Sequence, residues 1–531
     1  MKLLFCLPDQ IVDSGRDGVK YRPTISLPLG VLSMAAYLRE QKWPGEMEIY
    51  DSRLSGTLRE DSKGAVCFGD GPDDMADRIA AAKPDVVAIS NMFSWQVEKA
   101  YEMARLAKQA CPDATVVFGG PHASSFPREA LSADAIDYVV MGEGEERLHK
   151  LLGCLEAGKA VELQGVLGRE EDFSLLRPSK KAPISFISDL DSLPMPAYDL
   201  VDVDRYFHLQ ATGFSPRPRE WGKRAVTMLT SRGCPHQCVF CSIQATMGYK
   251  WRHNSPDYVA RHIQLLRNGC NIDFIHFEDD NFTYDHERYE QILDVLLAQD
   301  KPLPWDTPNG VRGDSWTLER VRKTKLSNCQ CLFVAIESAV QRVVDKVVKK
   351  RLDLKQVKEL MQYCQECRLR LQAFYVIGLP GETEAEIRKT VDFAMDCYDR
   401  FSVYPTISMA IPLPGTELHD IAIAGHLYEG ELEPKANQLV TEDFDPPLLR
   451  RIYGEAMRRK LWIFVKKTLT SRSDFSYNLK LLLQYRSMAA DILRHAFSGS
   501  VARVTQLVHK ERRPAPAGQA PADAEVSGGS P

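Results

Sequence analysis

The stretch Ser231–Cys241, with the sequence SRGCPHQCVFC, decides how this chain is interpreted. Its three cysteines, Cys234, Cys238 and Cys241, have C-x3-C-x2-C spacing and follow Ala225–Leu229, a short apolar segment typical of a buried strand. Thiolates that converge from one loop suit a thiophilic metal centre, and iron–sulfur clusters are held by such ligands. Because no fourth cysteine follows at a matching spacing, one iron of a [4Fe–4S] cluster would remain open to an exogenous ligand.

Arg232 and Gly233 directly precede the first of these cysteines. They are expected to place a positive charge and a flexible backbone beside the anionic cluster. The whole pattern resembles the signature of the radical S-adenosylmethionine (SAM) superfamily, in which SAM chelates the open iron through its amino and carboxylate groups. The resemblance implies a cluster bound by the three cysteines and SAM as a second cofactor.

The composition is that of an ordinary globular protein, with 44% hydrophobic and 26% charged residues among 531. This length suffices for two to four domains. No apolar run approaches the roughly 18–20 residues that span a bilayer, and Met1–Pro8 is too short for a signal peptide, so we expect a first buried strand there. Thirteen cysteines without a secretion signal predict a reducing, cytoplasmic location and no disulfide framework.

Buried strands and helices alternate over the first 150 residues. The segments expected to be strands are Met1–Leu7, Val86–Ser90, Thr115–Phe118 and Ala135–Met141, and those expected to be helices are Gly30–Gln41 and Gln96–Gln109. Strands that end in glycine-rich or polar turns predict an α/β fold, a doubly wound, Rossmann-like parallel sheet with its ligand at the carboxyl ends of the strands. No G-x-G-x-x-G follows the first strand, which disfavours NAD and FAD.

Six strand–helix units follow from residue 224 and predict a partial (β/α)6 barrel with its site at the C-terminal strand ends. The expected strands are Ala225–Leu229, Phe274–Phe277, Trp305–Asn309, Leu332–Ile336, Leu371–Ile377 and Thr406–Ile411. The expected domains are 1–150 (cofactor-binding sheet), 151–223 (connector), 224–420 (barrel), 421–513 (helical, basic) and 514–531 (a disordered tail).

The C-terminal part differs from the rest in charge. Residues 449–513 contain fifteen Lys or Arg against four Asp or Glu, whereas the whole chain has a net charge of −5. Three interpretations stay open: a solvated helical cap on the barrel, peripheral contact with an anionic membrane surface, or recognition of an anionic substrate or partner. Nucleic-acid binding is disfavoured because the remainder is acidic and carries no known motif.

Polar residues stand at the ends of the predicted barrel strands, where a SAM site needs them. A carboxylate in Glu278–Asn281 could accept the ammonium of SAM, although Asp and Asn also suit a helix N-cap. Glu337-Ser338 could bind the ribose hydroxyls, and Gly378–Thr383 is either an adenine contact or a glycine turn into a capped helix. No residue is assigned as catalytic. The candidate SAM contacts are Glu278, Asp279, Asp280, Asn309, Glu337 and Ser338.

The motif order CPHQCVFC, FEDDNFT, IESAVQRV and IGLPGET resembles the cobalamin-dependent (B12-dependent) radical SAM enzymes, over roughly residues 1–420. Within that family the motifs look closest to those of the fosfomycin-pathway methylase and the phosphinate methylases. The N-terminal sheet resembles the family's cobalamin-binding domain through the runs LPLG, DVVAIS, GGPH and GEGE. The residues that this resemblance implies as cobalamin contacts are Ser90, Gly119, Gly120, Glu143 and Gly144.

One histidine and four cysteines are expected not to bind metal. The chain lacks D-x-H-x-x-G, so base-off cobalamin without a protein histidine on cobalt is implied, and His122 is expected in a loop that packs near the corrin edge. Cys364 and Cys367 lie in a helical pattern, and we expect buried helix cysteines rather than a second cluster. Cys329 and Cys331, at the start of a strand, are expected in the core.

The resemblance implies a methyltransferase in which a 5′-deoxyadenosyl radical activates the substrate and methylcobalamin, recharged from a second SAM, supplies the methyl group. The acceptor would be an unactivated carbon or a phosphinate centre of a small-molecule or lipid-like substrate. An external electron donor of the flavodoxin or ferredoxin type is also implied. Two alternatives stay open: a cyclase or ring-rearranging enzyme with the same machinery but no methyl transfer, and a non-catalytic cobalamin- or cluster-binding sensor.

Overall fold

The first apolar segment of the chain forms β1 (Lys2–Leu7), an inner strand of a six-stranded sheet. The computed structural model describes residues 1–13, 23–169, 184–214, 224–430, 432 and 438–470. The sheet has the order β3 (Glu46–Asp51), β1, β6 (Val86–Ser90), β7 (Thr115–Gly119), β8 (Tyr138–Val140) and β9 (Val166–Gly168).

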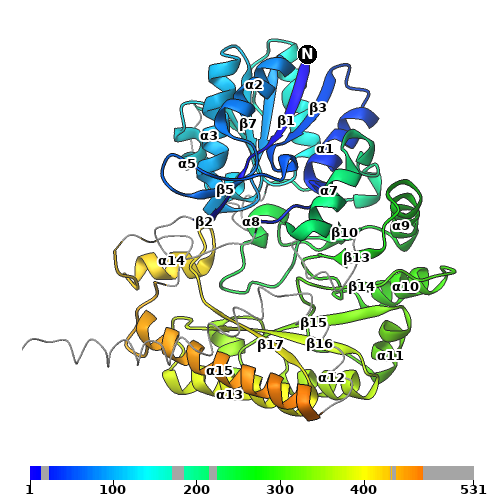
Figure 1. Ribbon diagram of the computed structural model, residues 1–531, viewed down its shortest axis with the longest axis vertical. Coiled ribbons are helices and arrows are strands. Elements are labelled where there is room, and N and C mark those ends of the chain that lie inside the picture. The colour runs from blue at the N-terminus through cyan, green and yellow to red at the C-terminus, as the bar shows by residue number, and fades with distance from the viewer. Residues whose placement is uncertain (14–22, 170–183, 215–223, 431, 433–437, 471–531) are drawn as a thin grey trace, which may run out of the picture. The chain divides into compact units, whose positions relative to one another are not determined.

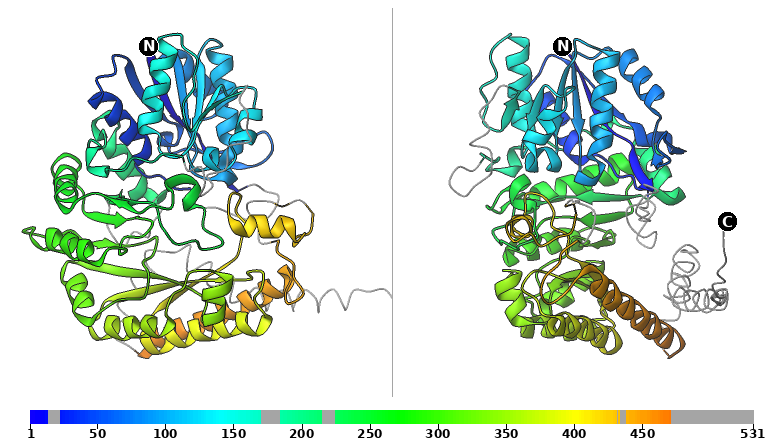
Figure 2. Two further views of the ribbon diagram at one scale, coloured as in Figure 1. Left: turned by 180° about the vertical axis from the view of Figure 1, so that it is seen from behind. Right: turned by 90° about the vertical axis from the view of Figure 1, so that its left-hand side faces the viewer.

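Helices cover both faces of this sheet because the side chains of β1 alternate between two cores. Leu3 and Phe5 pack into one core, and Leu4 and Cys6 pack into the other. The turned views in Figure 2 show the helices on either side of the strands. The doubly wound α/β architecture is therefore confirmed. The helices of this part are α1 (Leu29–Glu40), α2 (Pro72–Ala82), α3 (Val97–Ala110), α4 (Pro121–Ser125), α5 (Pro127–Ser132) and α6 (Glu145–Glu156).

Three features of the N-terminal part differ from the sequence-based expectation. The last strand, β9, runs antiparallel to β8, so the sheet is not wholly parallel. The strand β3 was not expected, since only its last two residues are buried. A small antiparallel sheet of β2 (Gln10–Asp13), β5 (Val66–Phe68) and β4 (Leu58–Glu60) is also present. Strands of three or four residues carry too little alternation to be recognised from sequence.

A second six-stranded sheet carries the three cysteines, and its strands follow one another in chain order. All neighbouring pairs are parallel, as the predicted partial barrel requires. Its strands are β10 (Ala225–Met228), β13 (Phe274–Phe277), β14 (Trp305–Asp306), β15 (Cys329–Glu337), β16 (Arg370–Ile377) and β17 (Tyr404–Met409).

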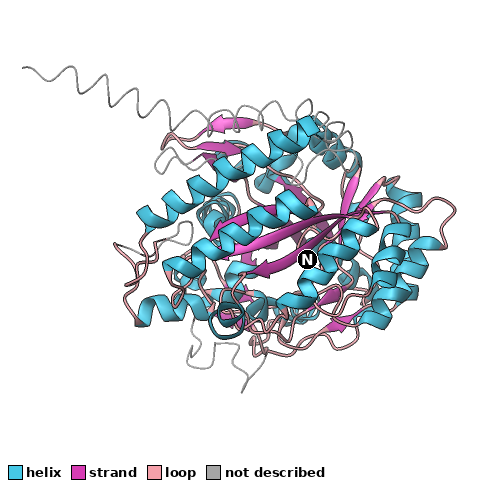
Figure 3. Ribbon diagram, turned by 90° about the horizontal axis from the view of Figure 1, so that it is seen from below, coloured by secondary structure: helices cyan, strands magenta, loops and turns pink. Residues whose placement is uncertain are grey.

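Helices line one face of this second sheet, as Figure 1 shows for α12 (Leu354–Glu366) and α13 (Glu384–Phe401) beside β15 to β17. In the view from below, these helices lie in front of the strands (Figure 3). Thr383 begins α13 with a capping box, in which its side chain and that of Glu386 satisfy each other's backbone N–H groups. The remaining helices on this side are α9 (Pro256–Cys270), α10 (His286–Leu297) and α11 (Leu318–Leu326).

The strand β14 is shorter than the predicted Trp305–Asn309 because the chain turns after Asp306. Gly310 N–H donates to the Thr307 carbonyl at 2.9 Å, and Gly310 has a φ of +87°. Pairing with β15 resumes at Val311, which bridges to Val334. Asn309 therefore lies in this turn and not within the strand.

The segments outside the two sheets are mostly helical where they are described. They include α7 (Val203–Leu209), α14 (Glu417–Ala424) and α15 (Pro446–Thr470). Residues 1–453 form one compact unit, and the part of α15 after Tyr453 belongs to a second. The predicted helical region beyond residue 470 and the tail 514–531 lie outside the described residues. Within the described chain, no helix has both the length and the apolarity needed to cross a membrane.

Candidate cofactor-binding site

The cysteine loop follows β10 and connects two short antiparallel strands, β11 (Ser231–Arg232) and β12 (Arg252–His253), which pair at its base. Gly233 follows with a φ of +83°, and a Cβ there would lie 2.5 Å from the carbonyl oxygen of Lys250. Only glycine fits this close approach without a shift of the backbone. The sequence SRGC therefore directs the chain sharply from the strand into the loop that carries the cysteines.

Cys234, Cys238 and Cys241 are half-buried on this loop. Burial raises the pKa of all three thiols, that of Cys241 to about 12, and the neighbouring thiols Cys238 and Cys234 raise it further because the groups are close. No three His, Cys, Asp or Glu side chains of the described residues could hold a single metal ion together. A cubane cluster instead bonds each thiolate to a different iron. Three neighbouring thiols on one loop fit that arrangement.

Asp279, at the end of β13, holds the start of the cysteine loop in place. One carboxylate oxygen accepts hydrogen bonds from Thr230 N at 3.0 Å, Thr230 Oγ1 at 2.8 Å and Ser231 Oγ at 2.6 Å. The side chain is almost fully buried. Asp279 is thus an anchor between β10 and β13, and its predicted contact with SAM stays a prediction.

The other candidates after β13 lie closer to the cysteines. Asp280 accepts a hydrogen bond from Gly233 N at 2.8 Å, and burial raises the pKa of its carboxyl to about 7. Glu278 is half-buried and its carbonyl accepts from the exposed Asn309 amide. The structure therefore brings Glu278, Asp280 and Asn309 to the same strand-end edge as the cysteine loop, where a SAM molecule on the cluster would have to lie.

Glu337 ends β15 in a strained conformation with a φ of +70°. Its Oε1 accepts from Lys350 Nζ at 2.8 Å in a buried ion pair. Both neighbours of this lysine, Lys349 and Arg351, also have positive φ values, of 62° and 52°. Such strain persists only where the surrounding structure enforces it, and it clusters at functional sites. Lys350 was not expected from the sequence, because the run VVKKRL looks like an ordinary charged surface segment.

Ser338, by contrast, uses its hydroxyl inside the protein. Its Oγ lies 3.0 Å from Thr390 Oγ1 of α13 and accepts from Val340 N at 3.2 Å. The residue is fully buried. Its contacts secure the turn after Glu337 against α13, and its predicted contact with the SAM ribose stays a prediction.

A large pocket of about 1390 Å³, part of it open to solvent, lies at the carboxyl ends of β6, β7 and β8. Most of its wall is apolar, including Leu29, Met34 and Leu148. Gly120, with a φ of +104°, has no room for a side chain, since a Cβ would lie 2.3 Å from the Asn91 carbonyl oxygen. The wall thus offers backbone and apolar side chains, which suit a large, mostly apolar cofactor such as a macrocycle. All five expected cobalamin contacts line it: Ser90, Gly119, Gly120, Glu143 and Gly144.

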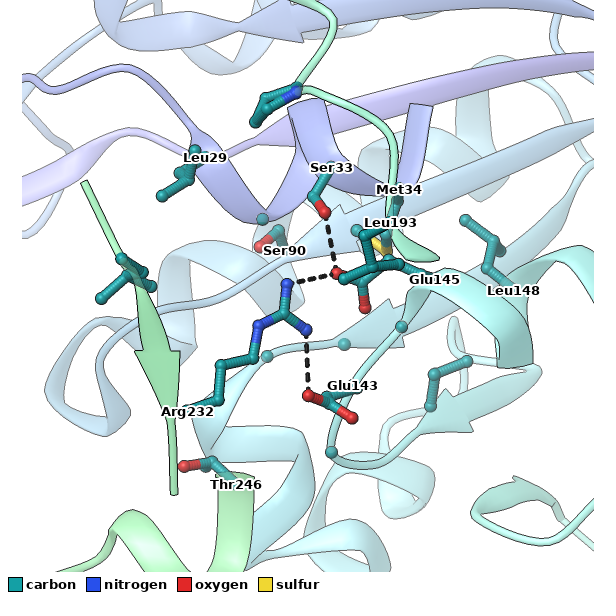
Figure 4. A pocket seen from close by; sticks show the side chains of 18 of the residues that line it. Leu29, Ser33, Met34, Ser90, Glu143, Glu145, Leu148, Leu193, Arg232 and Thr246 are labelled. Carbon is teal, nitrogen blue, oxygen red and sulfur yellow. Dashed lines mark hydrogen bonds and ion pairs between the residues drawn. The ribbon is translucent and has the colours of Figure 1, made fainter. Parts of the chain in front are cut away.

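Arg232 crosses from the cysteine loop into this pocket, as Figure 4 shows. Its guanidinium contacts Glu143 Oε1 at 2.9 Å and Glu145 Oε1 at 2.8 Å. Burial alone would raise the pKa of Glu145, but the charge of Arg232 outweighs it and lowers that pKa. The guanidinium of Arg232 is therefore paired with two carboxylates of the N-terminal part of the chain, and its expected role beside the cluster stays a prediction.

Two further side chains complete this network. Arg252 Nη1 lies 2.7 Å from Glu143 Oε1, and Ser33 Oγ donates to Glu145 Oε1 at 2.8 Å. The sequence gives no signal for this arrangement, since the partners are separated by about 90 to 110 positions. A predicted cobalamin contact, Glu143, is thus also a structural link between the two sheets.

His122 lies in α4 and not in a loop, which corrects the expectation for this residue. Its ring is buried, with Nε2 3.2 Å from Tyr101 Oη, and it packs against Phe118 and Phe126. It does not line the pocket. Burial lowers the pKa of His122 to about 4. The imidazole therefore belongs to the core of the N-terminal part, and its expected packing near the corrin edge stays a prediction.

Of the four cysteines that were expected to be buried without binding metal, three are buried. Cys329 and Cys331 are buried in β15, and Cys364 is buried in α12. Cys367 stands at the C-cap of α12 and is half-exposed, because the helix ends there.

Two family models match the chain: a B12 binding domain over residues 16–152 and the radical SAM superfamily over residues 228–394. The chain is 29% identical over 428 residues to cytidylyl-2-hydroxyethylphosphonate methyltransferase of Streptomyces wedmorensis, covering 75% of this chain and 78% of the relative. It is 30% identical over 408 residues to an uncharacterized methyltransferase of Pyrococcus horikoshii, covering 76% and 80%.

A solved structure with a similar fold is that of the cobalamin-dependent S-adenosylmethionine radical enzyme OxsB with aqua-cobalamin and S-adenosylmethionine bound. The TM-score is 0.65 at 14% sequence identity, covering 96% of this chain and 80% of the other. At this identity the similarity establishes the fold alone. It agrees with the order of the two sheets described above.

Proposed function

This chain belongs to the family of cobalamin-dependent radical SAM methyltransferases, and from that membership we propose that it transfers a methyl group to an unactivated carbon or a phosphinate centre of a small molecule. Its cofactors are a [4Fe–4S] cluster, SAM and cobalamin. When bound, they supply the 5′-deoxyadenosyl radical and the methyl group, while the protein supplies orientation and exclusion of water. Cys234, Cys238 and Cys241 would hold the cluster.

The observation that carries the proposal is the double ion pair of Arg232 with Glu143 and Glu145. It joins the loop of the three cysteines directly to the wall of the large pocket. Radical formation and methyl supply must act on one substrate, and this requires both cofactors to border one space. An ion pair removed from water has little freedom to rearrange, so it fixes the loop relative to the pocket.

The protein's own groups would orient SAM at the edge of the second sheet. Asp280 and Glu278 are carboxyl groups close to the cysteine loop, and Glu337 is held in place by Lys350. A carboxylate at this edge would accept the hydrogen bonds of an ammonium or a ribose hydroxyl. An electron donor of the flavodoxin or ferredoxin type, and membrane contact through residues 449–513, remain parts of the proposal.

The test uses the full chain reconstituted with the cluster and cobalamin, to which SAM and a reductant are added. S-adenosylhomocysteine should form in about one equivalent per bound cobalamin before substrate is added, since recharging cobalamin needs no substrate. With the true substrate, S-adenosylhomocysteine and 5′-deoxyadenosine should accumulate in about equal amounts. The Cys238→Ala variant should form no 5′-deoxyadenosine, whereas Cys364→Ala, on α12, should behave as the parent.

Two other outcomes would contradict methyl transfer. Substrate-dependent 5′-deoxyadenosine without S-adenosylhomocysteine would identify a cyclase or ring-rearranging enzyme. Cofactor binding with neither product would identify a sensor. The product mass separates the first outcome from methylation, because methylation adds one methyl group whereas cyclisation removes hydrogens.

A further inference from the structure

The inward face of β15, β16 and β17 carries mainly apolar and uncharged polar side chains. Along these strands, alternate side chains point to opposite faces. Tyr375 points outward, where its ring lies 6.4 Å from that of Phe393 on α13. Its neighbours Phe374 and Val376 therefore point inward, away from the helices seen beside these strands in Figure 1. The inward side chains are half-buried, so this wall is accessible.

One half of the inward face is a flat apolar surface. The rings of Phe333 and Phe374 lie 5.7 Å apart at an interplanar angle of 32°. Ala335 is directly beside Phe374 in the strand register. Gly310 approaches both, and a Cβ there would lie 3.3 Å from the Phe374 ring. Two tilted rings with small groups beside them form an apolar surface against which another planar group can pack.

The other half of the face is polar but uncharged. Gln372 Nε2 donates to Thr406 Oγ1 at 2.8 Å, and Thr406 pairs with Phe374 in the strand register. Ser408 follows two residues later and is exposed. The amide and the hydroxyls can each donate and accept hydrogen bonds without adding a charge.

The described strands β15 to β17 carry two charged residues, Glu337 and Arg370, which have the same parity as the inward side chains but stand at the ends of their strands, away from the two rings. Glu337 ends β15 and is paired with Lys350. Arg370 begins β16, at the opposite end of the strands from the cysteine loop. An anion on this face would lose its hydration without gaining a cation, and the negative faces of the two aromatic rings would repel it.

We propose that the substrate presents an uncharged, planar apolar group to Phe333 and Phe374 and hydrogen-bonds through its edge to the amide and hydroxyls beside them. The assignment rests on the proposed methyl transfer and narrows it. A carbon of a neutral ring system, or a carbon next to one, accepts the methyl group, and a phosphinate centre does not. The chain then differs in substrate class from its relative that is named for a cytidylyl phosphonate.

The test compares two probes of the same shape, 2-naphthamide and 2-naphthoate, by equilibrium dialysis against the reconstituted full chain with SAM. The neutral amide should bind at least about tenfold more tightly than the carboxylate. Phe374→Leu should weaken amide binding about fivefold, because stacking is lost while the volume is nearly kept. Gln372→Lys should shift the preference toward the carboxylate by about tenfold, because it adds the missing cation.

Phe393→Leu is the matched control, since it makes the same change on the helix side of the same sheet. It should leave both dissociation constants unchanged. Equal or tighter binding of 2-naphthoate by the parent protein would overturn the proposal. A preference for the amide that neither Phe374→Leu nor Gln372→Lys alters would also overturn it, because the probe would then bind elsewhere.

Formation of S-adenosylhomocysteine in the same preparations keeps this inference separate from the proposed function. If that product forms but the probes do not discriminate, the substrate class is wrong and methyl transfer stands. If the probes discriminate as expected but no S-adenosylhomocysteine forms, the surface is correctly assigned and methyl transfer is wrong.

Discussion

Three half-buried thiols on one loop, those of Cys234, Cys238 and Cys241, are the residues on which iron binding should depend. Replacing all three by alanine should abolish the cluster's absorbance and reduce the iron content from about four atoms per chain to none. Cobalamin should still bind, because the pocket at the N-terminal sheet does not use these thiols. Iron and cobalamin are measured on the same anaerobically reconstituted samples.

The control for this experiment is the pair Cys364→Ala and Cys367→Ala on α12. Iron content should remain that of the parent, since Cys364 is buried among helix side chains. Retention of about four irons by the triple variant would show that the cluster is held elsewhere.

The buried ring of His122 leads to a spectroscopic prediction. It contacts Tyr101 and does not line the pocket, so it cannot reach a cobalt ion bound there. The electron paramagnetic resonance spectrum of the cob(II)alamin form should therefore lack nitrogen superhyperfine splitting. Splitting that disappears in His122→Ala would contradict both the geometry and the base-off assignment.

The same residue predicts a dependence of stability on pH. Burial lowers the pKa of His122 to about 4, and Tyr101 and Glu129 are the titratable groups that face it. Unfolded chains protonate histidine near its ordinary pKa of about 6.5. The stabilisation is therefore complete above about pH 6.5 and is lost as the pH falls toward 4, by up to about 3 kcal/mol.

His122→Phe should flatten this part of the profile, because phenylalanine cannot take up the proton. Urea unfolding at pH 7.5 and pH 5 measures the difference. His208→Phe, at an exposed position of α7, is the control and should follow the parent. If His122→Phe lost as much stability between pH 7.5 and pH 5 as the parent does, protonation of His122 would not be the cause of the loss.

At the scale of elements, the turn between β7 and α4 shapes the pocket that we propose for cobalamin. Gly120 has a φ of +104°, and a Cβ would lie 2.3 Å from the Asn91 carbonyl oxygen. Gly120→Ala should therefore displace the turn after β6 or β7, cost roughly 2 kcal/mol of stability, and weaken cobalamin binding at least about tenfold while the cluster still assembles. Absorbance of bound cobalamin after gel filtration measures the loss.

Gly153→Ala is the matched control, because this glycine lies in α6 with no atom near the position of its Cβ. Alanine there should keep cobalamin binding and raise stability by about 0.5–1 kcal/mol through its better helix propensity. Normal cobalamin binding by Gly120→Ala would show that the turn is not a wall of the cobalamin site.

At the scale of the whole molecule, residues 1–453 are joined across the two sheets by the buried Arg232 network. Arg232→Met should leave Glu145 without its cation and destabilise the protein by about 3–5 kcal/mol. Adding Glu145→Gln should restore part of this loss, since the unpaired charge is removed while Ser33 keeps a hydrogen-bond partner. Denaturant unfolding of the three variants and the parent gives the coupling energy between the two residues.

Cobalamin retention adds a readout that stability alone does not move. In the double variant, the cobalamin dissociation constant should stay raised even where the unfolding free energy recovers, because the loop is no longer fixed to the pocket. Additive losses of stability, with cobalamin binding unchanged, would show that Arg232 and Glu145 do not act together.

Much of the fold followed from local patterns. The strands β6 and β13 have the predicted bounds, and β1, β7, β15 and β16 overlap their predicted segments, because buried parallel strands are short apolar runs with clear polar ends. The strand β14 is shorter than predicted, since the residues after Asp306 form a turn that Gly310 permits. The sequence likewise placed the three cysteines and the strand-end carboxylates at one edge of a sheet.

The sequence by itself determined the two sheets, the family and the proposed cluster ligands, because each rests on residues within a few positions of one another. Only the tertiary structure decided which polar groups are already used. It paired Arg232 with Glu143 and Glu145, turned His122 into the core, committed Ser338 to Thr390, and left the inward face of β15 to β17 without a free charge. These contacts join residues far apart in the chain, and the free energy of burying a polar group depends on the partner it meets, which no local pattern specifies.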